Sequence, residues 1–488
     1  MSSEFYPTLN RNVQCGNSLV GYDVTEHLIL DAAEEDLLNP FDWVVAFPGV
    51  VGNGGFEVVI GNPPYDVLEK ARGAASWPHA TLRDYLPQRA DYAPARGGKL
   101  NLYRLFLVQS IRLTRTNGRF GMIVPLSLAA DISTASTRKY VLSALREPVL
   151  DCFPQKDNST RRVFRRAKLS TVVVTGARSR NPVPPTNSIT TRVFPGNNLT
   201  DTPIENVLTI ADCTLLDPIA LPIPLTDVDE WKLCRRLHAQ PSTQRVADLY
   251  DSYTVNRGEI NQTVYRDYIT ATTRGTASLL KGVEVGAFEQ RTTLSQGRRE
   301  WIDERRLLAD HKQKRVPPSL RIATQRITGV DERQRLVATL IETGAWFADS
   351  TNSISSLPDA PLGLDYLVAL LNSDLYQWRF RITSTNNNVG TNELLALPVH
   401  VPNPTSAKDQ LAVVAVRSAG AHVAHIKANQ ISSQSADAKD RHQRRLIAAM
   451  ARLNNAVYGL YGLNVAERAL VTARLSRMPI VAAAGEEP

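Results

Sequence analysis

Short apolar runs alternate with amphipathic stretches over the first 180 residues. Residues 56–60 and 119–125 are apolar runs bounded by glycine or proline, and 171–175 is a third; such runs are typical of buried strands. Residues 101–115 carry apolar side chains at helical spacing, and 133–146 predicts a second helix. Strands that alternate with helices predict an α/β fold with a mostly parallel sheet.

The pattern changes twice after this region. Eight prolines crowd into residues 182–224, which predicts a proline-rich linker over 182–226 after an α/β domain at 1–181. A mixed α/β domain is expected over 227–404, with a strand at 321–327 and a helix near 364–379. Residues 405–488 are rich in alanine and predict a C-terminal helical region.

Composition narrows the class of protein. The chain has 488 residues, of which 43% are hydrophobic and 21% charged, so it predicts at least two globular domains and no wholesale disorder. The four cysteines form no CxxC pair, which argues against a disulfide scaffold and predicts no metal site. The chain shows neither a signal-peptide pattern nor a long apolar run, so a cytoplasmic protein with no membrane segment is expected.

The net charge is +8 and the pI about 9.3, which favours a polyanionic partner through counterion release.

The sharpest motif is Asn62-Pro63-Pro64-Tyr65, directly after the strand at 56–60. Loops at the carboxyl ends of parallel strands are where α/β sheets bind ligands. Two prolines make the backbone rigid, so the Asn62 amide and a proline carbonyl can both accept hydrogens from one NH₂ group. Tyr65 offers a flat face for stacking. These features suit methylation of an exocyclic amine, a reaction that needs acceptors and positioning.

The motif and its surroundings resemble the gamma-class N6-adenine DNA methyltransferases, particularly the Taq-type and fused type IIG restriction–modification enzymes. The resemblance includes FDWVVAFPGVVGNGGFEVVIGNPPY, GGKLNLYRLFLVQSIRLTRTNGRFGMIVPLSL, LLNSDLYQWRFRITSTNNNVGTNELLALPV and NNAVYGLYGLNVAERALV, and it covers most of residues 10–470 in order. It implies an incomplete Rossmann-like methyltransferase sheet at 1–181, a DNA target-recognition domain at 227–404 and closing helices.

The resemblance also implies roles for single residues. Asn62 and the Pro63 carbonyl would hold the adenine amine, and Tyr65 and Phe164 would contact a base flipped out of the duplex. Phe106 matches an aromatic residue near the adenine of S-adenosylmethionine, the implied cofactor. Asn17 stands where family members usually have an aspartate that binds the same adenine.

Two basic segments are candidate contacts to double-stranded DNA, the implied substrate. The first surrounds Phe164 and comprises Arg161, Arg162, Arg165, Arg166 and Lys168. Its residues predict phosphate contacts, with a solvated basic face as the alternative. The second comprises Arg298, Arg299, Arg305, Arg306, Lys312, Lys314 and Arg315. Interspersed acidic residues make ordinary salt bridging at least as good an interpretation there.

The resemblance leaves one part of the family unmatched. No Gly-rich strand–loop–helix for S-adenosylmethionine precedes Asn62, because the glycines of residues 50–56 lead into a strand. A partner chain carrying the cofactor-binding half would explain this. A truncated copy, or a non-catalytic DNA-specificity subunit, would explain it as well.

Two other methyltransferase classes fit less well. RNA and protein-glutamine methyltransferases share the NPPY loop, but they lack a DNA-reading domain of about 180 residues such as the one expected from residue 227 onward. C5-cytosine methyltransferases need a Pro-Cys nucleophile, and none of the four cysteines follows a proline.

Overall fold

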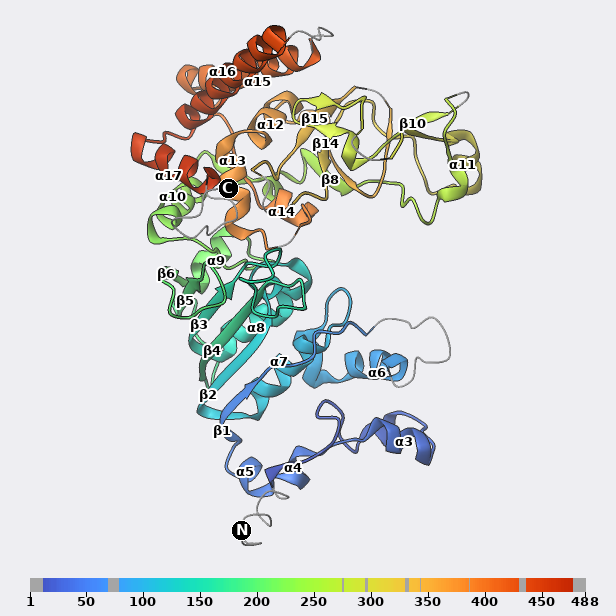
Figure 1. The fold of residues 1–488 in the computed structure, drawn as a ribbon, viewed down its shortest axis with the longest axis vertical. Helices are drawn as coiled ribbons and strands as arrows, with labels where there is room; N and C mark the ends of the chain where they lie inside the picture. The colour runs from blue at the N-terminus through green and yellow to red at the C-terminus, as the bar shows by residue number, and fades with distance from the viewer. Residues whose placement is uncertain are drawn as a thin grey trace. The chain divides into compact units, whose positions relative to one another are not determined.

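The computed structural model describes residues 12–68, 79–273, 276–294, 297–329, 333–342, 344–385, 387–429 and 436–476 (Figure 1). The chain divides into two compact units, Met1–Val228 and Asp229–Pro488. Within the described residues, no helix combines the length and the apolar character needed to cross a bilayer.

The first unit is built on a six-stranded sheet. Its strands are β1 (Phe56–Gly61), β2 (Thr114–Pro125), β3 (Leu145–Phe153), β4 (Thr171–Arg178), β5 (Ser188–Val193) and β6 (Ile204–Thr209), in the spatial order β1-β2-β4-β3-β5-β6. β1 is parallel to β2, and β3 to β5, but β4 lies antiparallel between β2 and β3. The α/β class is confirmed. The sheet is mixed rather than mostly parallel, because β4 returns beside β3 without a crossover helix.

The first unit also contains helices. They are α2 (Val24–His27), α3 (Ala32–Leu38), α4 (Trp43–Ala46), α5 (Pro48–Gly52), α6 (His79–Tyr85), α7 (Leu102–Leu113), α8 (Ala135–Ala144) and α9 (Ile210–Leu216). Of these, α7, α8 and α9 contact the sheet. α7 packs against β1 and β2, and α8 packs against β3. Asn101 is the N-cap of α7, and its side chain accepts a hydrogen bond from the Tyr103 amide at 3.3 Å.

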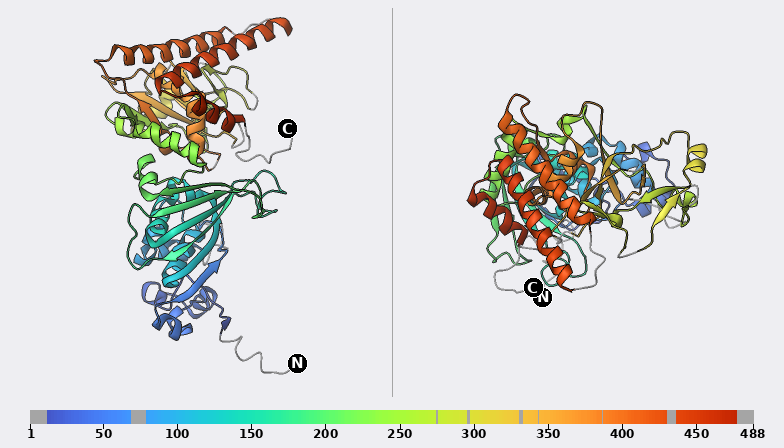
Figure 2. Two further views of the ribbon diagram at one scale, coloured as in Figure 1. Left: turned by 90° about the vertical axis from the view of Figure 1, so that its left-hand side faces the viewer. Right: turned by 90° about the horizontal axis from the view of Figure 1, so that it is seen from above.

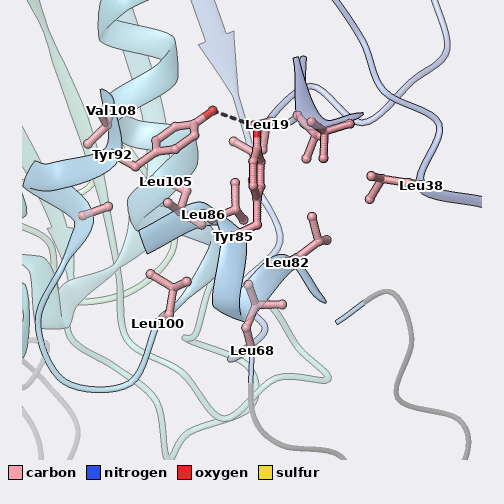
Figure 3. Close-up of a cluster of buried hydrophobic side chains, with 13 residues drawn as sticks. Leu19, Leu38, Leu68, Leu82, Tyr85, Leu86, Tyr92, Leu100, Leu105 and Val108 are labelled. Atoms are coloured by element: carbon pink, nitrogen blue, oxygen red, sulfur yellow. Dashed lines mark hydrogen bonds between the residues drawn. The ribbon is translucent and has the colours of Figure 1, made fainter. Parts of the chain in front are cut away.

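A buried hydrophobic cluster attaches the residues before β1 to α7 (Figure 3). Leu105 and Val108 of α7 are fully buried in it. Tyr92 also belongs to the cluster, and its hydroxyl donates to the carbonyl of Leu19 at 2.9 Å. The amphipathic helix predicted from the sequence therefore uses its apolar face to hold the segment that leads into β1.

The proline-rich region is not a separate linker. Residues 182–226 contribute β5 and β6 to the sheet, and the boundary between the two units falls after Val228. Ile189, Thr191 and Val193 alternate into the core and are almost fully buried. The prolines lie outside both strands, so their missing N–H groups do not interrupt the hydrogen bonds between strands. A high proline content in this region was therefore compatible with strands between the prolines.

One buried arginine of α8 binds the end of this region to the turn that follows β2. The Arg138 guanidinium, on α8, donates through Nε to the carbonyls of Ala220 and Leu221, each at 2.9 Å. Its Nη1 donates to the carbonyl of Leu128 at 2.8 Å. Burial lowers the pKa of Arg138 to about 10, which still leaves the side chain charged at neutral pH. The carbonyls that it binds therefore replace the water removed on burial.

The second unit is mixed α/β and ends in helices. Its helices are α10 (Val228–Ala239), α11 (Glu304–Asp310), α12 (Leu364–Leu371), α13 (Asp374–Thr383), α14 (Thr391–Leu395), α15 (Ala407–Ala428), α16 (Ala436–Leu460) and α17 (Val465–Ser476). Its strands are β7 (Thr243–Arg245), β8 (Tyr253–Arg257), β9 (Ile269–Thr270), β10 (Ala277–Leu280), β11 (Val285–Gly286), β12 (Glu289–Gln290), β13 (Glu300–Ile302), β14 (Arg321–Gln325), β15 (Ala338–Ile341), β16 (Trp346–Phe347), β17 (Thr351–Ser356) and β18 (Pro398–His400).

Two four-stranded sheets organise the second unit, in the orders β15-β14-β17-β8 and β16-β10-β13-β9. The helix predicted near 364–379 is two helices, α12 and α13. The break falls at Asn372, whose side chain accepts from the Ala338 amide at 3.1 Å and donates to the Ala338 carbonyl at 2.8 Å. α15 and α16 pack side by side, as expected for the helical tail (Figure 2).

Replacing Arg138 by methionine should loosen the end of the first unit. Arg138→Met leaves buried carbonyls without a donor, so we expect a loss of about 3 kcal/mol in the opening free energy of residues 204–226. Hydrogen–deuterium exchange of peptides from this region measures it. Lys139→Met, at the exposed neighbouring position, is the matched control. Equal exchange in both variants would contradict the assigned role of Arg138.

Candidate active site

The NPPY loop begins where the pairing of β1 ends. The last paired residue of β1 is Gly61, opposite Met122 of β2. Pro63 and Pro64 have no backbone N–H, so they cannot extend the ladder and they turn the chain away from the sheet. Pro63 is buried, whereas Asn62 and Pro64 are exposed. The loop thus anchors one proline in the protein and leaves the Asn62 amide accessible to a substrate.

Tyr65 connects the loop to β2. Its hydroxyl oxygen lies 3.0 Å from the carbonyl oxygen of Ile123 and 3.0 Å from Oδ1 of Asn62. A phenol has one proton, so it donates to one of these oxygens at a time. Burial raises the pKa of Tyr65 to about 12, and the hydroxyl therefore stays protonated and able to donate at neutral pH.

Two further aromatic rings meet Tyr65. The Tyr103 ring, from the first turn of α7, lies edge-on with its centroid 6.3 Å from that of Tyr65. The Phe164 ring, from the loop between β3 and β4, lies 6.1 Å away at an interplanar angle of 67°. Both arrangements are favourable for aromatic pairs. The structure therefore brings Asn62, Tyr65 and Phe164 together, although about 100 residues separate the loop from Phe164.

Sequence reasoning missed Tyr103 and the carbonyl of Ile123. The Tyr103 hydroxyl lies 3.3 Å from Oγ of Ser127, just after β2. The signal for Tyr103 was its position in the first turn of the helix predicted at 101–115, close to the carboxyl ends of the strands. No sequence signal points to a backbone carbonyl as the partner of Tyr65.

The loop that carries Phe164 is held by its own polar groups. The Arg162 guanidinium donates to the carbonyl of Lys156 at 3.1 Å and to that of Arg165 at 2.9 Å. The Asn197 amide donates to the carbonyls of Thr160 and Arg162 at 3.3 and 3.2 Å. Arg162 therefore stabilises the conformation of this loop through hydrogen bonds to the backbone of the loop itself.

The other basic residues beside Phe164 differ in their surroundings. Lys168 Nζ lies 2.7 Å from the Asp157 carboxylate, and Arg161 is half-buried. Arg165 and Arg166 are exposed, and their side chains make no ion pair with any residue that the structure describes. Of the five predicted phosphate contacts, these two are the best placed for a polyanion.

In the second basic segment, several cations have internal partners. Arg299 pairs with Glu284 at 3.3 Å. Arg306 lies over the Tyr268 ring at 5.1 Å and 3.8 Å from the Asp310 carboxylate. Lys314 lies over the Tyr265 ring at 4.6 Å. These interactions favour the salt-bridging interpretation for this segment.

The two residues predicted to bind the cofactor adenine lie elsewhere in the first unit. Asn17 is half-buried, and its Oδ1 accepts from the Leu19 amide at 3.3 Å, which leaves one lone pair for a ligand. Phe106 is partly buried and packs against the hydrophobic cluster on α7. An amide acceptor and an aromatic ring suit an adenine, but Asn17 is a weaker acceptor than the aspartate it replaces.

A cavity of about 560 Å³ opens beside the residues that follow Asn17, and Ser18, Trp43 and Tyr92 are among the residues that line it. Its carboxylates are engaged: Asp23 pairs with Arg89, Asp91 pairs with Arg112, and Asp42 caps α4. Neither Asn17 nor Phe106 lines it. The cavity therefore does not fit the ribose of S-adenosylmethionine.

The Gly-rich stretch before β1 has a structural role. α5 ends at Gly52, and Gly54 and Gly55 adopt φ of +87° and +118° on the way into β1. A Cβ on Gly55 would collide with the carbonyl of Leu113 at the end of α7. These glycines therefore allow a close backbone approach rather than forming a cradle for a cofactor.

Comparisons with known proteins agree with this organisation. Residues 6–150 match the Eco57I restriction-modification methylase family. The putative type II restriction enzyme and methyltransferase RM.MjaORFECS2P of Methanocaldococcus jannaschii is 26% identical over 112 residues, which are 23% of this chain and 8% of that protein. Among solved structures, the type IIL restriction-modification enzyme MmeI in complex with DNA is similar at a TM-score of 0.51 and 11% identity.

The MmeI match covers 89% of this chain and 58% of that one. At this identity the likeness shows the fold alone. The chain thus spans a little over half of MmeI and a small part of the curated relative. The family match and the curated relative are both of the restriction–modification methylase type, each over part of this chain.

Substitutions at Tyr65 should separate its hydroxyl from its ring. Tyr65→Phe removes only the hydroxyl and its bond to Ile123, so we expect a loss of about 1 kcal/mol in the free energy of unfolding. Tyr65→Ala also removes the packing on Tyr103 and Phe164 and should cost about 3 kcal/mol. Urea titration of the chain measures both. A Tyr65→Phe variant as unstable as Tyr65→Ala would show that the ring packing contributes little.

Proposed function

We propose that the chain is the catalytic-loop component of a restriction–modification DNA methyltransferase that methylates N6 of a flipped adenine. The observation that carries the proposal is the meeting of Asn62, Tyr65 and Phe164 beyond the carboxyl end of β1. The match of residues 6–150 to a restriction–modification methylase family supports it.

In this proposal Asn62 and Pro63 act on the amine. The lone pair of an exocyclic amine is delocalised into its ring, which makes the nitrogen a poor nucleophile. Hydrogen bonds from the amine to Oδ1 of Asn62 and to the Pro63 carbonyl return electron density to nitrogen and stabilise the positive charge that develops there. The exposed Asn62 amide, oriented by the Tyr65 hydroxyl, is available for this bond.

The aromatic residues hold the base. A base inside a duplex cannot reach the loop after β1, so it must be flipped out. Tyr65 stacks on it and Phe164 packs on it from another side, while Arg165 and Arg166, next to Phe164, contact the phosphates. The choice of adenine over cytosine, which also has an exocyclic amine, rests on the resemblance of the NPPY segment to N6-adenine enzymes.

S-adenosylmethionine, when bound, supplies the electrophilic methyl group. The residues that fit it are those for its adenine end, Asn17 and Phe106. The described residues offer neither a Gly-rich cradle nor an unengaged carboxylate in the cavity beside them. The proposal therefore assigns the rest of the cofactor site to a partner chain. The same observation favours a second candidate, a non-catalytic DNA-specificity subunit.

Removal of the Asn62 amide tests the chemistry. In a complex with the cofactor-binding half, Asn62→Ala should lower the single-turnover rate of methyl transfer to DNA by about 10²–10³, because one positioned acceptor is removed. DNA affinity should change little, since the residues that bind phosphate remain. Tyr65→Phe keeps the stacking ring and loses only the hydroxyl beside Asn62, so its rate should fall less than that of Asn62→Ala. An Asn62→Ala complex with the full rate would rule out the assigned role.

The exposed arginines test DNA binding. Arg165→Ala combined with Arg166→Ala should weaken duplex binding and reduce the slope of log K against log salt by about 0.9 for each phosphate that is no longer neutralised. Fluorescence anisotropy over a salt series measures both quantities. Lys139→Ala removes an exposed cation on α8 and serves as the control. An unchanged slope in the double variant would favour the solvated-face interpretation.

Cofactor affinity separates the two candidate functions. The chain without a partner should bind S-adenosylmethionine weakly, because it holds only the adenine end, and isothermal titration measures this. A complex that binds the cofactor tightly supports the enzyme. Binding in the low micromolar range by the chain without a partner would show that residues 12–60 form a more complete site than we assign.

A further inference from the structure

β1 is an edge strand of the six-stranded sheet. It is the first strand in the order β1-β2-β4-β3-β5-β6, and among the described residues its only strand partner is β2 (Figure 2). Strands that are parallel to their neighbours normally lie inside sheets with both faces covered by helices. An open parallel strand leaves unpaired N–H and C=O groups along its free edge, which can pair with another chain.

One face of β1 is also uncovered. Val58 and Ile60 are two residues apart, so their side chains point to the same face, and they are 58% and 78% exposed. On β4, in the interior of the same sheet, Val172 and Val174 are fully buried. The apolar face of β1 therefore lacks the cover that interior strands have.

The edge strand on the opposite side of the sheet, β6, carries a charge beside its exposed apolar residue. β6 exposes Val207 at 57%, but the residue two positions earlier on the same face is the exposed Glu205. A charge on an edge strand discourages pairing with another chain. On one face β1 carries the apolar residues Val58 and Ile60, whereas its charged residue, Glu57, points to the other face and pairs with Arg115 at 2.8 Å. Exposed Val44 and Val45 on α4 add to the apolar surface of the segment that leads into β1.

We infer that β1 is the docking strand for a partner chain that carries the S-adenosylmethionine-binding half, and that this partner adds a parallel strand beside β1 and a helix over Val58 and Ile60. The inference rests on the proposed function. Asn62 directly follows β1, and ligands of open α/β sheets bind between the carboxyl ends of adjacent strands. A parallel strand docked on β1 would end beside Asn62, where the methyl donor is needed.

The residues that we assign to the cofactor agree with this occupant. Asn17 and Phe106 account only for its adenine end. A second copy of this chain would bring another NPPY loop but no Gly-rich cradle. It would therefore leave the cofactor site incomplete.

Photocrosslinking tests the surface directly. The chain carries p-benzoylphenylalanine in place of Ile60, or in place of Val207 as the matched border-strand control, and is co-expressed with the polypeptides encoded by the genes that flank its own. We expect position 60, and not position 207, to crosslink to a polypeptide whose sequence contains a Gly-rich strand–loop–helix. In gel filtration, Ile60→Lys should weaken assembly with that polypeptide by about tenfold or more, because a charge would be buried in an apolar interface. Val207→Lys should leave assembly intact.

Several results would overturn the inference. They are crosslinking to a second copy of the chain, equal capture from both positions, no crosslink at position 60, or unimpaired assembly of Ile60→Lys. Assembly is measured without methylation, so a failure of the docking surface can be distinguished from a failure of the proposed function. If the complex forms through β1 but Asn62→Ala keeps full methylation, the proposed function fails while the docking surface stands.

Discussion

The parallel pairing of β1 with β2 is the constraint on which the candidate site depends. It sets Gly61 opposite Met122 and so places the loop after β1 beside Ile123 of β2. The hydroxyl of Tyr65 can then donate to the Ile123 carbonyl and lie beside Asn62. A shift of one residue in this register would turn every side chain of β1 to the opposite face of the sheet and separate Tyr65 from these partners.

The antiparallel return of β4 completes the site from a distant part of the sequence. β4 lies between β2 and β3 and runs antiparallel to both, so β3 points in the same direction as β2 and β1. The loop that joins β3 to β4 therefore lies at the carboxyl ends of these strands, as the loop after β1 does. Arg162 and Asn197 give that loop its shape, and Phe164 contacts Tyr65. The proposed chemistry thus combines a rigid acceptor loop with an aromatic residue carried on a second loop that also bears exposed cations.

Much of the first unit could be predicted from sequence, because its signals are local. The strand at 56–60, the helix at 101–115 and the NPPY turn follow from side-chain periodicity and from the absence of an N–H in proline. Other features depend on distant partners. β5 and β6 were missed because prolines surround them, and the helix break at Asn372 depends on the backbone of Ala338. The internal role of Arg162 could not be separated from phosphate binding by residue type.

The same limit applies to the site. Asn62 and Tyr65 could be named from the motif, and Phe164 from resemblance, whereas Tyr103 and the Ile123 carbonyl required the three-dimensional arrangement. The open border at β1 likewise appears only when the strand order is known, since Val58 and Ile60 look in sequence like any buried strand.

The identity of the methylated base tests the central claim most directly. DNA from cells that express the chain together with its cofactor-binding partner can be digested to nucleosides and analysed by mass spectrometry. Our account predicts N6-methyladenine that is absent from cells without this chain. N4-methylcytosine, C5-methylcytosine or no added methyl group in the presence of the assembled complex would contradict it.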